Sequence, residues 1–297
     1  MNPMKNNNVN VLHILSFLII ILSVVATATG LFYTTGGAPF DIINQYGDSV
    51  KMYGDGIYAR DSFFRVLIFK GTDLTILVVG VPMLAAATLL DLKKKTVKRR
   101  ILLASVIALF LYYASNIVFG VTYNSLHLVY IALFSSSLFA LIIAMSGMDY
   151  SELEKSITNV LPYKGIYAFL AVTGIALFIA WLPDIISALL AGRALAMIEV
   201  YTTEPTYVLD MGIISPLAFS CLFLLRKREG LGYMLLSILL IICMVMGIML
   251  PVQTVFQVAA GIAIPLPVLI TKIGIFVVLA VFAAYFEIRF MRILQQR

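Results

Sequence analysis

Charge is scarce in this sequence, since only 12% of its 297 residues are Asp, Glu, Lys or Arg. A soluble domain carries about 25% charged residues, so this chain has too few charges to cover a surface in water. Its two cysteines exclude a disulfide-rich secreted scaffold. The apolar fraction is 62%, which excludes a disordered chain. The composition therefore indicates an integral membrane protein.

The apolar residues gather in long continuous runs, which favour helices over the alternating strands of a membrane β-barrel. The first run contains Ala26-Thr27-Ala28, a pattern typical of signal-peptide cleavage, but it continues to Phe32 and we expect it to be retained. A spanning helix needs about 20 such residues. We predict an all-α integral membrane protein with eight transmembrane helices, at about 12–34, 65–90, 101–122, 127–147, 165–190, 208–225, 231–255 and 267–288.

The basic residues predict the orientation of these spans. With a cytoplasmic N-terminus, fifteen of the 21 Lys and Arg residues fall on the inner side and four on the outer side. This asymmetry follows the positive-inside rule, so we expect both termini in the cytoplasm and the protein in a cell membrane, most simply a bacterial plasma membrane. Anionic lipid on the inner side accounts for the net charge of +6 without a nucleic-acid partner.

Two stretches of the chain share one order of features. Asp73 is followed by Pro82, an apolar run and a basic loop, and Asp210 is followed by Pro216, an apolar run and a basic loop. This order predicts a parallel 4+4 repeat, with halves at 1–160 and 161–297. The alternative is that any eight-span protein with short basic inner loops shows the same order. The linker 147–165 is expected to be a solvated loop, or else a short amphipathic helix.

Polar residues inside the spans cluster at one depth. At about 1.5 Å of rise per residue, Asp73 lies about 27 Å from the inner boundary near Asp91, and Asp184, Asp210 and Lys272 reach similar levels. Charges in hydrocarbon are costly, so this level in the outer third is the candidate ligand site. The predicted substrate-binding residues are Lys70, Asp73, Asn116, Asp184, Tyr207, Asp210, Gln253 and Lys272.

Pairing of these groups leaves two interpretations open. Lys70 and Asp73 share a helical face at i, i+3 and can pair, whereas Lys272 needs an acid on another helix, Asp73 or Asp210. The residues either line a polar cavity open to the outside, or form structural pairs and interfacial contacts. Glu287 is expected at a charged inner end of the last helix.

The residue types for metal, cofactor or thiol chemistry are nearly absent. His13 and His127 fall at opposite faces of the membrane, and Cys221 and Cys243 lack Cys-x-x-Cys spacing. Phosphate-loop, HExxH, GxSxG and dinucleotide motifs are missing. We therefore expect no metal and no cofactor, and the sequence identifies no catalytic residue.

Residues 35–64 form the longest segment between spans. Gly47-Asp48-Ser49 is a turn signal between two half-apolar runs, at 41–46 and 50–53, and predicts a small hairpin. The segment follows the first span on the outer side. It is either a connector with interfacial tyrosines or a lid over the polar level.

Several short motifs together resemble a family. They are Tyr53-Gly54-x-Gly56-x-Tyr58-x-x-Asp61-Ser62, Gly71-Thr72-Asp73, Tyr123-Asn124, and Tyr201-Thr202-Thr203 with Leu209-Asp210. In this order the chain looks like a group of uncharacterised bacterial multispan membrane proteins. That resemblance covers most of the chain and implies no activity.

Three functions fit the sequence. The first is a transporter-like or binding protein that handles a small molecule or a lipid in an outer-leaflet polar cavity. The second is a membrane-embedded enzyme that acts on a lipid-linked substrate, with Asp73 or Asp210 as base and Lys70 or Lys272 as electrophile. The third is a scaffold subunit that binds a membrane-protein partner. We favour the first, although secondary transporters usually bind nearer the midplane.

Overall fold

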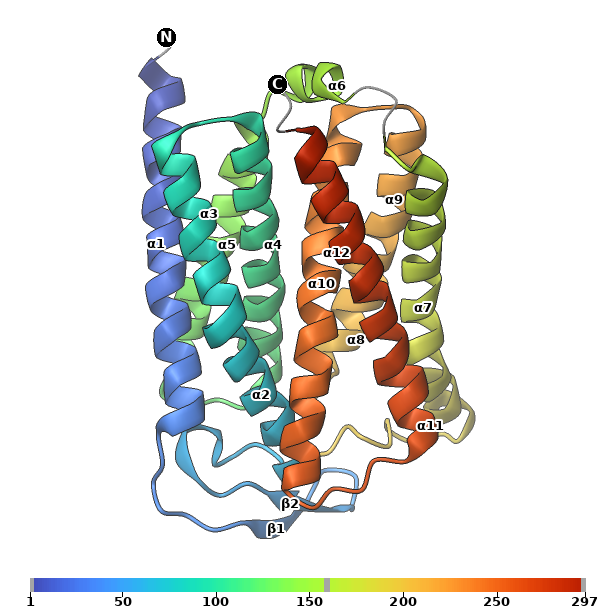
Figure 1. Cartoon of the computed structure of the whole chain (residues 1–297). Coiled ribbons are helices and arrows are strands. Elements are labelled where there is room, and N and C mark those ends of the chain that lie inside the picture. The colour runs from blue at the N-terminus through green and yellow to red at the C-terminus, as the bar shows by residue number, and fades with distance from the viewer. Residues whose placement is uncertain (1–2, 158–160, 295–297) are drawn as a thin grey trace.

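The computed structural model describes residues 3–157 and 161–294, and most of them are helical (Figure 1). A two-stranded hairpin follows the first helix, and shorter helical turns interrupt or connect the long helices. The elements are α1 (Pro3–Phe32), β1 (Phe40–Ile43), β2 (Ser49–Met52), η1 (Gly56–Tyr58), α2 (Phe63–Thr75), η2 (Ile76–Gly80), α3 (Val81–Lys93), α4 (Val97–Gly120), α5 (His127–Ser146), α6 (Tyr150–Ser156), α7 (Tyr163–Leu190), α8 (Pro205–Leu209), η3 (Asp210–Ile214), α9 (Ser215–Arg226), α10 (Gly230–Ala259), α11 (Leu266–Val268), η4 (Leu269–Gly274) and α12 (Ile275–Ile293).

Seven helices in the described ranges are long and apolar enough to cross a membrane, so the chain is a polytopic membrane protein. Each of the first seven predicted spans overlaps one of them. The eighth predicted span, 267–288, falls on α11, η4 and α12, and it is not among the seven. Glu287, Arg289 and Arg292 all lie in α12, which leaves that helix a short apolar part. The prediction of eight spans is therefore confirmed only for seven.

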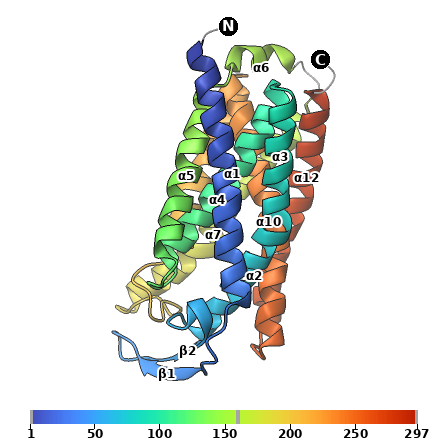
Figure 2. The ribbon, with the colours of Figure 1, turned by 90° about the vertical axis from the view of Figure 1, so that its left-hand side faces the viewer.

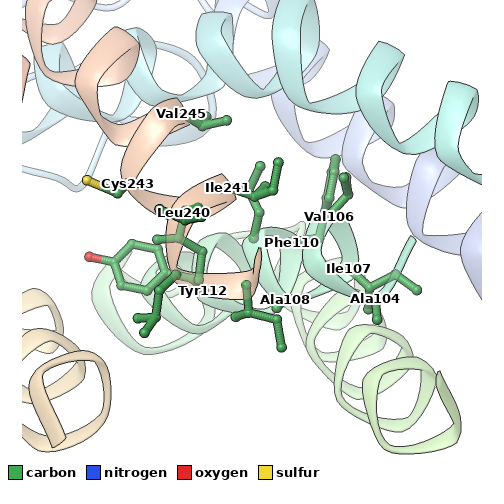
Figure 3. Close-up of a cluster of buried hydrophobic side chains, with 14 of the residues drawn as sticks. Ala104, Val106, Ile107, Ala108, Phe110, Tyr112, Leu240, Ile241, Cys243 and Val245 are labelled. Atoms are coloured by element: carbon green, nitrogen blue, oxygen red, sulfur yellow. The ribbon is translucent and has the colours of Figure 1, made fainter. Parts of the chain in front are cut away.

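The two most buried spans, α4 and α10, form the centre of the bundle. Helix α10 packs on α2, α4, α9 and α12, and α4 packs on α3 and α5. Figure 3 shows apolar side chains of both helices, such as Phe110 and Ile241, meeting in this core. Two turned views agree that α6 lies at the end of the bundle where α1 starts and α12 ends, opposite the hairpin (Figures 1 and 2).

Two of the spans contain a π-helical turn at the point where a proline follows. The N–H of Val81 bonds the carbonyl of Ile76 one residue before Pro82, and the N–H of Ser215 bonds the carbonyl of Asp210 one residue before Pro216. A proline ring clashes with the carbonyl four residues earlier in a regular α-helix. The wider turn relieves that clash, and such turns are frequent at functional sites.

The hairpin predicted in residues 35–64 is confirmed. Strands β1 and β2 pair antiparallel, with Phe40 opposite Met52, and Gly47 adopts a positive φ of 87° in the turn. The linker between the predicted halves contains the helix α6, capped by the carboxylate of Asp149, and it buries Leu153 completely. The expectation of a solvated loop there is wrong, because this buried leucine anchors the segment to the bundle.

Close approach of α2 and α10 depends on Gly71. A Cβ atom at this position would lie 2.5 Å from the Cα of Gln253, so we expect Gly71→Ala to force the helices apart and to destabilise the protein by about 1–3 kcal/mol. Gly212 in η3 is the matched control, since a Cβ atom added there would meet nothing within 4 Å. Thermal unfolding in detergent measures both variants. Equal stability of the two alanine variants would contradict the packing described here.

Candidate functional site

Asp73 lies on α2 with only 1% of its surface exposed. One carboxylate oxygen accepts a hydrogen bond from the Tyr58 hydroxyl at 2.7 Å, and the other accepts from the Tyr113 hydroxyl at 3.0 Å. Gly30 on α1 makes room for this carboxylate, because a Cβ atom there would clash with Oδ2. Asp73 is thus enclosed by neutral donors from η1 and α4 and by the backbone of α1.

Asp210 is the first residue of η3, and 5% of its surface is exposed. Its two carboxylate oxygens accept hydrogen bonds from the Tyr112 hydroxyl and from Trp181 Nε1, each at 2.8 Å. Tyr112 and Tyr113 are neighbours on α4, so one turn of this central helix serves both buried carboxylates. No hydrogen bond or ion pair among the described residues joins Asp73 to Asp210 directly.

Two further predicted residues bond groups of the first half of the chain. Lys70 Nζ donates to the Tyr53 hydroxyl at 2.8 Å and lies 4.9 Å from the centre of that ring. None of the ion pairs within the described ranges joins Lys70 to Asp73, so the pairing that we considered is not formed. Gln253 on α10 donates to Thr72 at 2.8 Å.

The remaining predicted residues also form pairs. Asn116 accepts from the Thr206 hydroxyl at 3.0 Å, and Tyr207 donates to Asp184 at 2.8 Å. The Tyr207 ring stacks on Trp181, with 4.7 Å between ring centroids. The side chain of Lys272 lies outside what the structure describes. The predicted level therefore consists of several hydrogen-bonded pairs, and of these residues Asp210 also borders a cavity.

The cavity lies between α4, α7, η3, α10 and α12 and has a volume of about 40 Å³. Its walls are mainly apolar, and the polar atoms come from three residues. Thr173 contributes a buried hydroxyl that has no hydrogen-bond partner among the described residues. The lining residues are Tyr112, Thr173, Leu177, Asp210, Ile214, Leu239, Ile242, Cys243, Met246, Phe276 and Leu279.

A second group of polar residues, at the hairpin end of the bundle, was missed by the sequence analysis. We call it the outer cluster. The motifs Asp61-Ser62 and Tyr201-Thr202-Thr203 carry part of it, but nothing in the sequence brings them together. Its members are Asp61, Ser62, Arg65, Glu199, Tyr201 and Glu204.

Asp61 accepts hydrogen bonds from two different segments of the chain. Its Oδ1 accepts from the Thr122 N–H at 2.9 Å and from the Tyr201 hydroxyl at 3.0 Å. Its Oδ2 is buried without a partner among the described residues. Burial raises the pKa of Asp61 to about 6, against the opposing effect of these hydrogen bonds.

The other residues of the outer cluster connect residues 35–64 and the start of α2 to the loop before α8. Ser62 hydrogen-bonds the carboxylate of Glu199, and Arg65 forms an ion pair with Glu204. Burial also raises the pKa of Glu199. Asn44 in the hairpin turn region donates to the Glu199 carbonyl at 2.8 Å. Residues 35–64 therefore contact the second half of the chain at several points.

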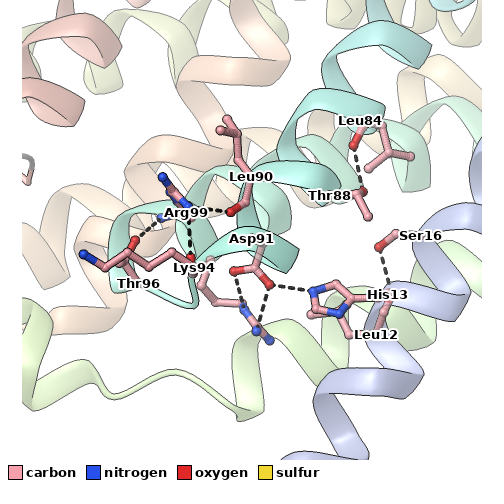
Figure 4. A network of polar contacts seen from close by, with 11 residues as sticks. Leu12, His13, Ser16, Leu84, Thr88, Leu90, Asp91, Lys94, Thr96 and Arg99 are labelled. Carbon is pink, nitrogen blue, oxygen red and sulfur yellow. Dashed lines mark hydrogen bonds and ion pairs between the residues drawn. The ribbon is translucent and has the colours of Figure 1, made fainter.

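The opposite end of the bundle holds a buried ion pair (Figure 4). Asp91 is fully buried and lies 2.8 Å from His13 Nε2 and 2.9 Å from an Arg100 guanidinium nitrogen. Arg99 instead donates to the Leu90 carbonyl at 2.8 Å and closes the turn between α3 and α4. Within the described ranges, no group of three His, Cys, Asp or Glu side chains can hold a metal ion.

The raised pKa of Asp61 predicts a pH dependence of stability. Because the folded protein holds this proton more tightly than the unfolded chain, the contribution of Asp61 to stability is fully present below about pH 4 and is lost as the pH rises through about 6, by roughly 2–3 kcal/mol. Asp61→Asn removes the titrating proton, so we expect a flatter profile of melting temperature between pH 4 and 7.

Asp41→Asn, at an exposed position of β1, is the matched control for this experiment. It keeps Asp61 intact and is expected to retain the wild-type slope. A wild-type slope in Asp61→Asn as well would assign the pH dependence to other groups.

Comparison with protein-family models, curated proteins and solved structures found no match to any of them. The motif resemblance described above therefore brings neither an activity nor a substrate to this chain. The function rests on the chemistry that the buried carboxylates and the cavity can perform.

Proposed function

We propose that this polytopic membrane protein binds a small molecule or a lipid in the outer third of a cell membrane and handles it as a transporter does. Asp210 is the central polar group of the site. The ligand has a mainly apolar body and one polar or positively charged group. The observation that carries the proposal is the mainly apolar cavity that Asp210 borders.

The chemistry of this cavity selects the ligand class. Eight of its eleven lining residues are apolar, so the apolar part of a ligand gains free energy by leaving water for this cavity. Among the described residues, the Asp210 carboxylate accepts hydrogen bonds from a hydroxyl and an indole N–H, and it has no cationic partner there. A buried carboxylate favours a partner that donates a hydrogen bond or carries positive charge. An amphiphile with an amine or hydroxyl group meets both conditions.

The size of the cavity limits what it holds in this structure. A volume of about 40 Å³ is smaller than the roughly 150 Å³ that holds a benzene molecule. The site accepts the end of a chain or one small group, and a larger ligand requires the walls to move. Met246 and Phe276 are only half-buried, and methionine adapts readily to different shapes. We propose that these side chains open the cavity.

We further propose eight spans, cytoplasmic ends for α1 and α12, and the parallel 4+4 arrangement. The basic stretches Lys93–Arg100 and Arg226–Arg228 follow α3 and α9, on the side opposite the hairpin. The π-helical turns before Pro82 and Pro216 give α2–α3 and α8–α9 the same interruption. The packing of α1 on α3 and of α7 on α9 is also matched.

The ligand class is tested with photoreactive amphiphiles in lipid nanodiscs. We expect a long-chain amine with a diazirine close to its amino group to label cavity residues such as Met246 several-fold more than a fatty acid of equal length with the diazirine at the matching position. Asp210→Asn keeps an acceptor for Trp181 and can donate to the Tyr112 oxygen, so the fold is retained while the charge is lost. The preference for the amine should then disappear. Equal labelling by both amphiphiles in the wild type contradicts the proposed role of Asp210.

The cavity itself is tested by filling it. Leu279→Phe narrows the space between α10 and α12, so we expect labelling by the amine to fall several-fold. Val278→Phe is the matched control, because Val278 is 56% exposed on the neighbouring face of α12. Labelling that survives Leu279→Phe would place the amphiphile on the outside of the bundle.

A further inference from the structure

Another buried carboxyl, Glu287 on α12, takes no part in the site around Asp210. Only 5% of its surface is exposed, so the expectation of a charged inner end is wrong for this residue. The side chain turns toward α10, where Glu287 Oε1 accepts a hydrogen bond from the Ser237 hydroxyl at 2.8 Å. The Ser237 oxygen in turn accepts from the Ser105 hydroxyl of α4 at 2.9 Å. The three residues form a chain across α4, α10 and α12.

The residues beside Glu287 on α12 pack against aromatic side chains within the described part of the chain. On the side of α7, Phe169 packs on Phe286 with ring centroids 5.8 Å apart, and on α10 Tyr233 stacks on Phe290 at 6.4 Å. Arg289, on the same helix, donates to the Tyr285 hydroxyl at 3.3 Å.

The hydrogen bonding of the carboxyl is also incomplete. None of the ion pairs within the described ranges includes Glu287. Its Oε2 is buried and lacks a hydrogen-bond partner among those residues.

An ionised carboxylate is unfavourable in this environment. Buried charges in proteins are paired or strongly hydrogen-bonded, and membrane interiors penalise an unpaired one further. A neutral carboxylic acid fits the observed contacts, because its carbonyl oxygen is Oε1, which accepts from Ser237. The proton then belongs on Oε2, the atom without a partner.

We propose that Glu287 is a proton-binding site at the contact between the two halves of the chain. The ligand of this site is a proton, carried on Oε2. The Ser105–Ser237–Glu287 chain joins α4 of the first half to α10 and α12 of the second. Loss of the proton creates a charge at this contact, so proton binding and the packing of the halves are coupled. This goes beyond the proposed amphiphile site and does not depend on it.

Infrared difference spectra between the wild type and Glu287→Gln, both purified in nanodiscs, test the proposal. At pH 7 an ordinary glutamate is protonated in only about 1 molecule in 500, so a neutral Glu287 gives a distinct carboxylic-acid carbonyl band. We expect this band in the wild type and its loss in Glu287→Gln. The band should also shift in heavy water. A difference spectrum that contains only carboxylate bands overturns the proposal.

Ser237→Ala provides a second, independent variant. It leaves the carboxyl in place and removes the hydrogen bond to its carbonyl oxygen, so we expect the acid band to move to higher frequency without disappearing. An unchanged band in Ser237→Ala means that the band arises from another acid and overturns the assignment to Glu287. Neither result depends on binding of an amphiphile, so the failure of one proposal is distinguishable from the failure of the other.

Discussion

A carboxyl group buried in a membrane-spanning bundle has to find its hydrogen-bond partners within the protein, because hydrocarbon offers none. This constraint explains the central position of α4. Its neighbouring residues Tyr112 and Tyr113 donate to Asp210 and Asp73, which lie on two different interrupted helices. Since Asp73 belongs to the first half of the chain and Asp210 to the second, α4 links the halves through polar contacts as well as through its apolar core with α10.

The same constraint operates differently at the two ends of the bundle. At the end of α3, Asp91 pairs with His13 and Arg100, so the burial of its charge is compensated by a permanent cation. In the outer cluster a single guanidinium, that of Arg65, faces several carboxyls. Burial there raises the pKa of Asp61 to about 6. The first end is a fixed anchor, whereas the second is sensitive to pH.

The sequence predicted features that depend on local patterns and not those that depend on distant partners. Apolar runs located the first seven spans, and the turn residues around Gly47 located the hairpin. A depth estimate at 1.5 Å per residue brought the polar residues to one level, but it carries no information on which helix faces which. The contact between Asp61 and Tyr201 joins residues 140 positions apart. The inward direction of the Glu287 side chain depends on how α12 packs on α10. The nearby Arg289 and Arg292 instead suggested a charged helix end.

The two interrupted helices place their buried carboxyls, Asp73 and Asp210, in different surroundings. Counted back from the proline, Asp73 lies nine residues before Pro82 and Asp210 six residues before Pro216, which is nearly one helical turn closer. Asp73 is therefore a turn away from the π-helical segment and is sealed by two tyrosines. Asp210 is the first residue of the other π-helical segment, η3, and it borders the cavity. A shift of nearly one turn thus separates a carboxyl enclosed between helices from one that borders a cavity.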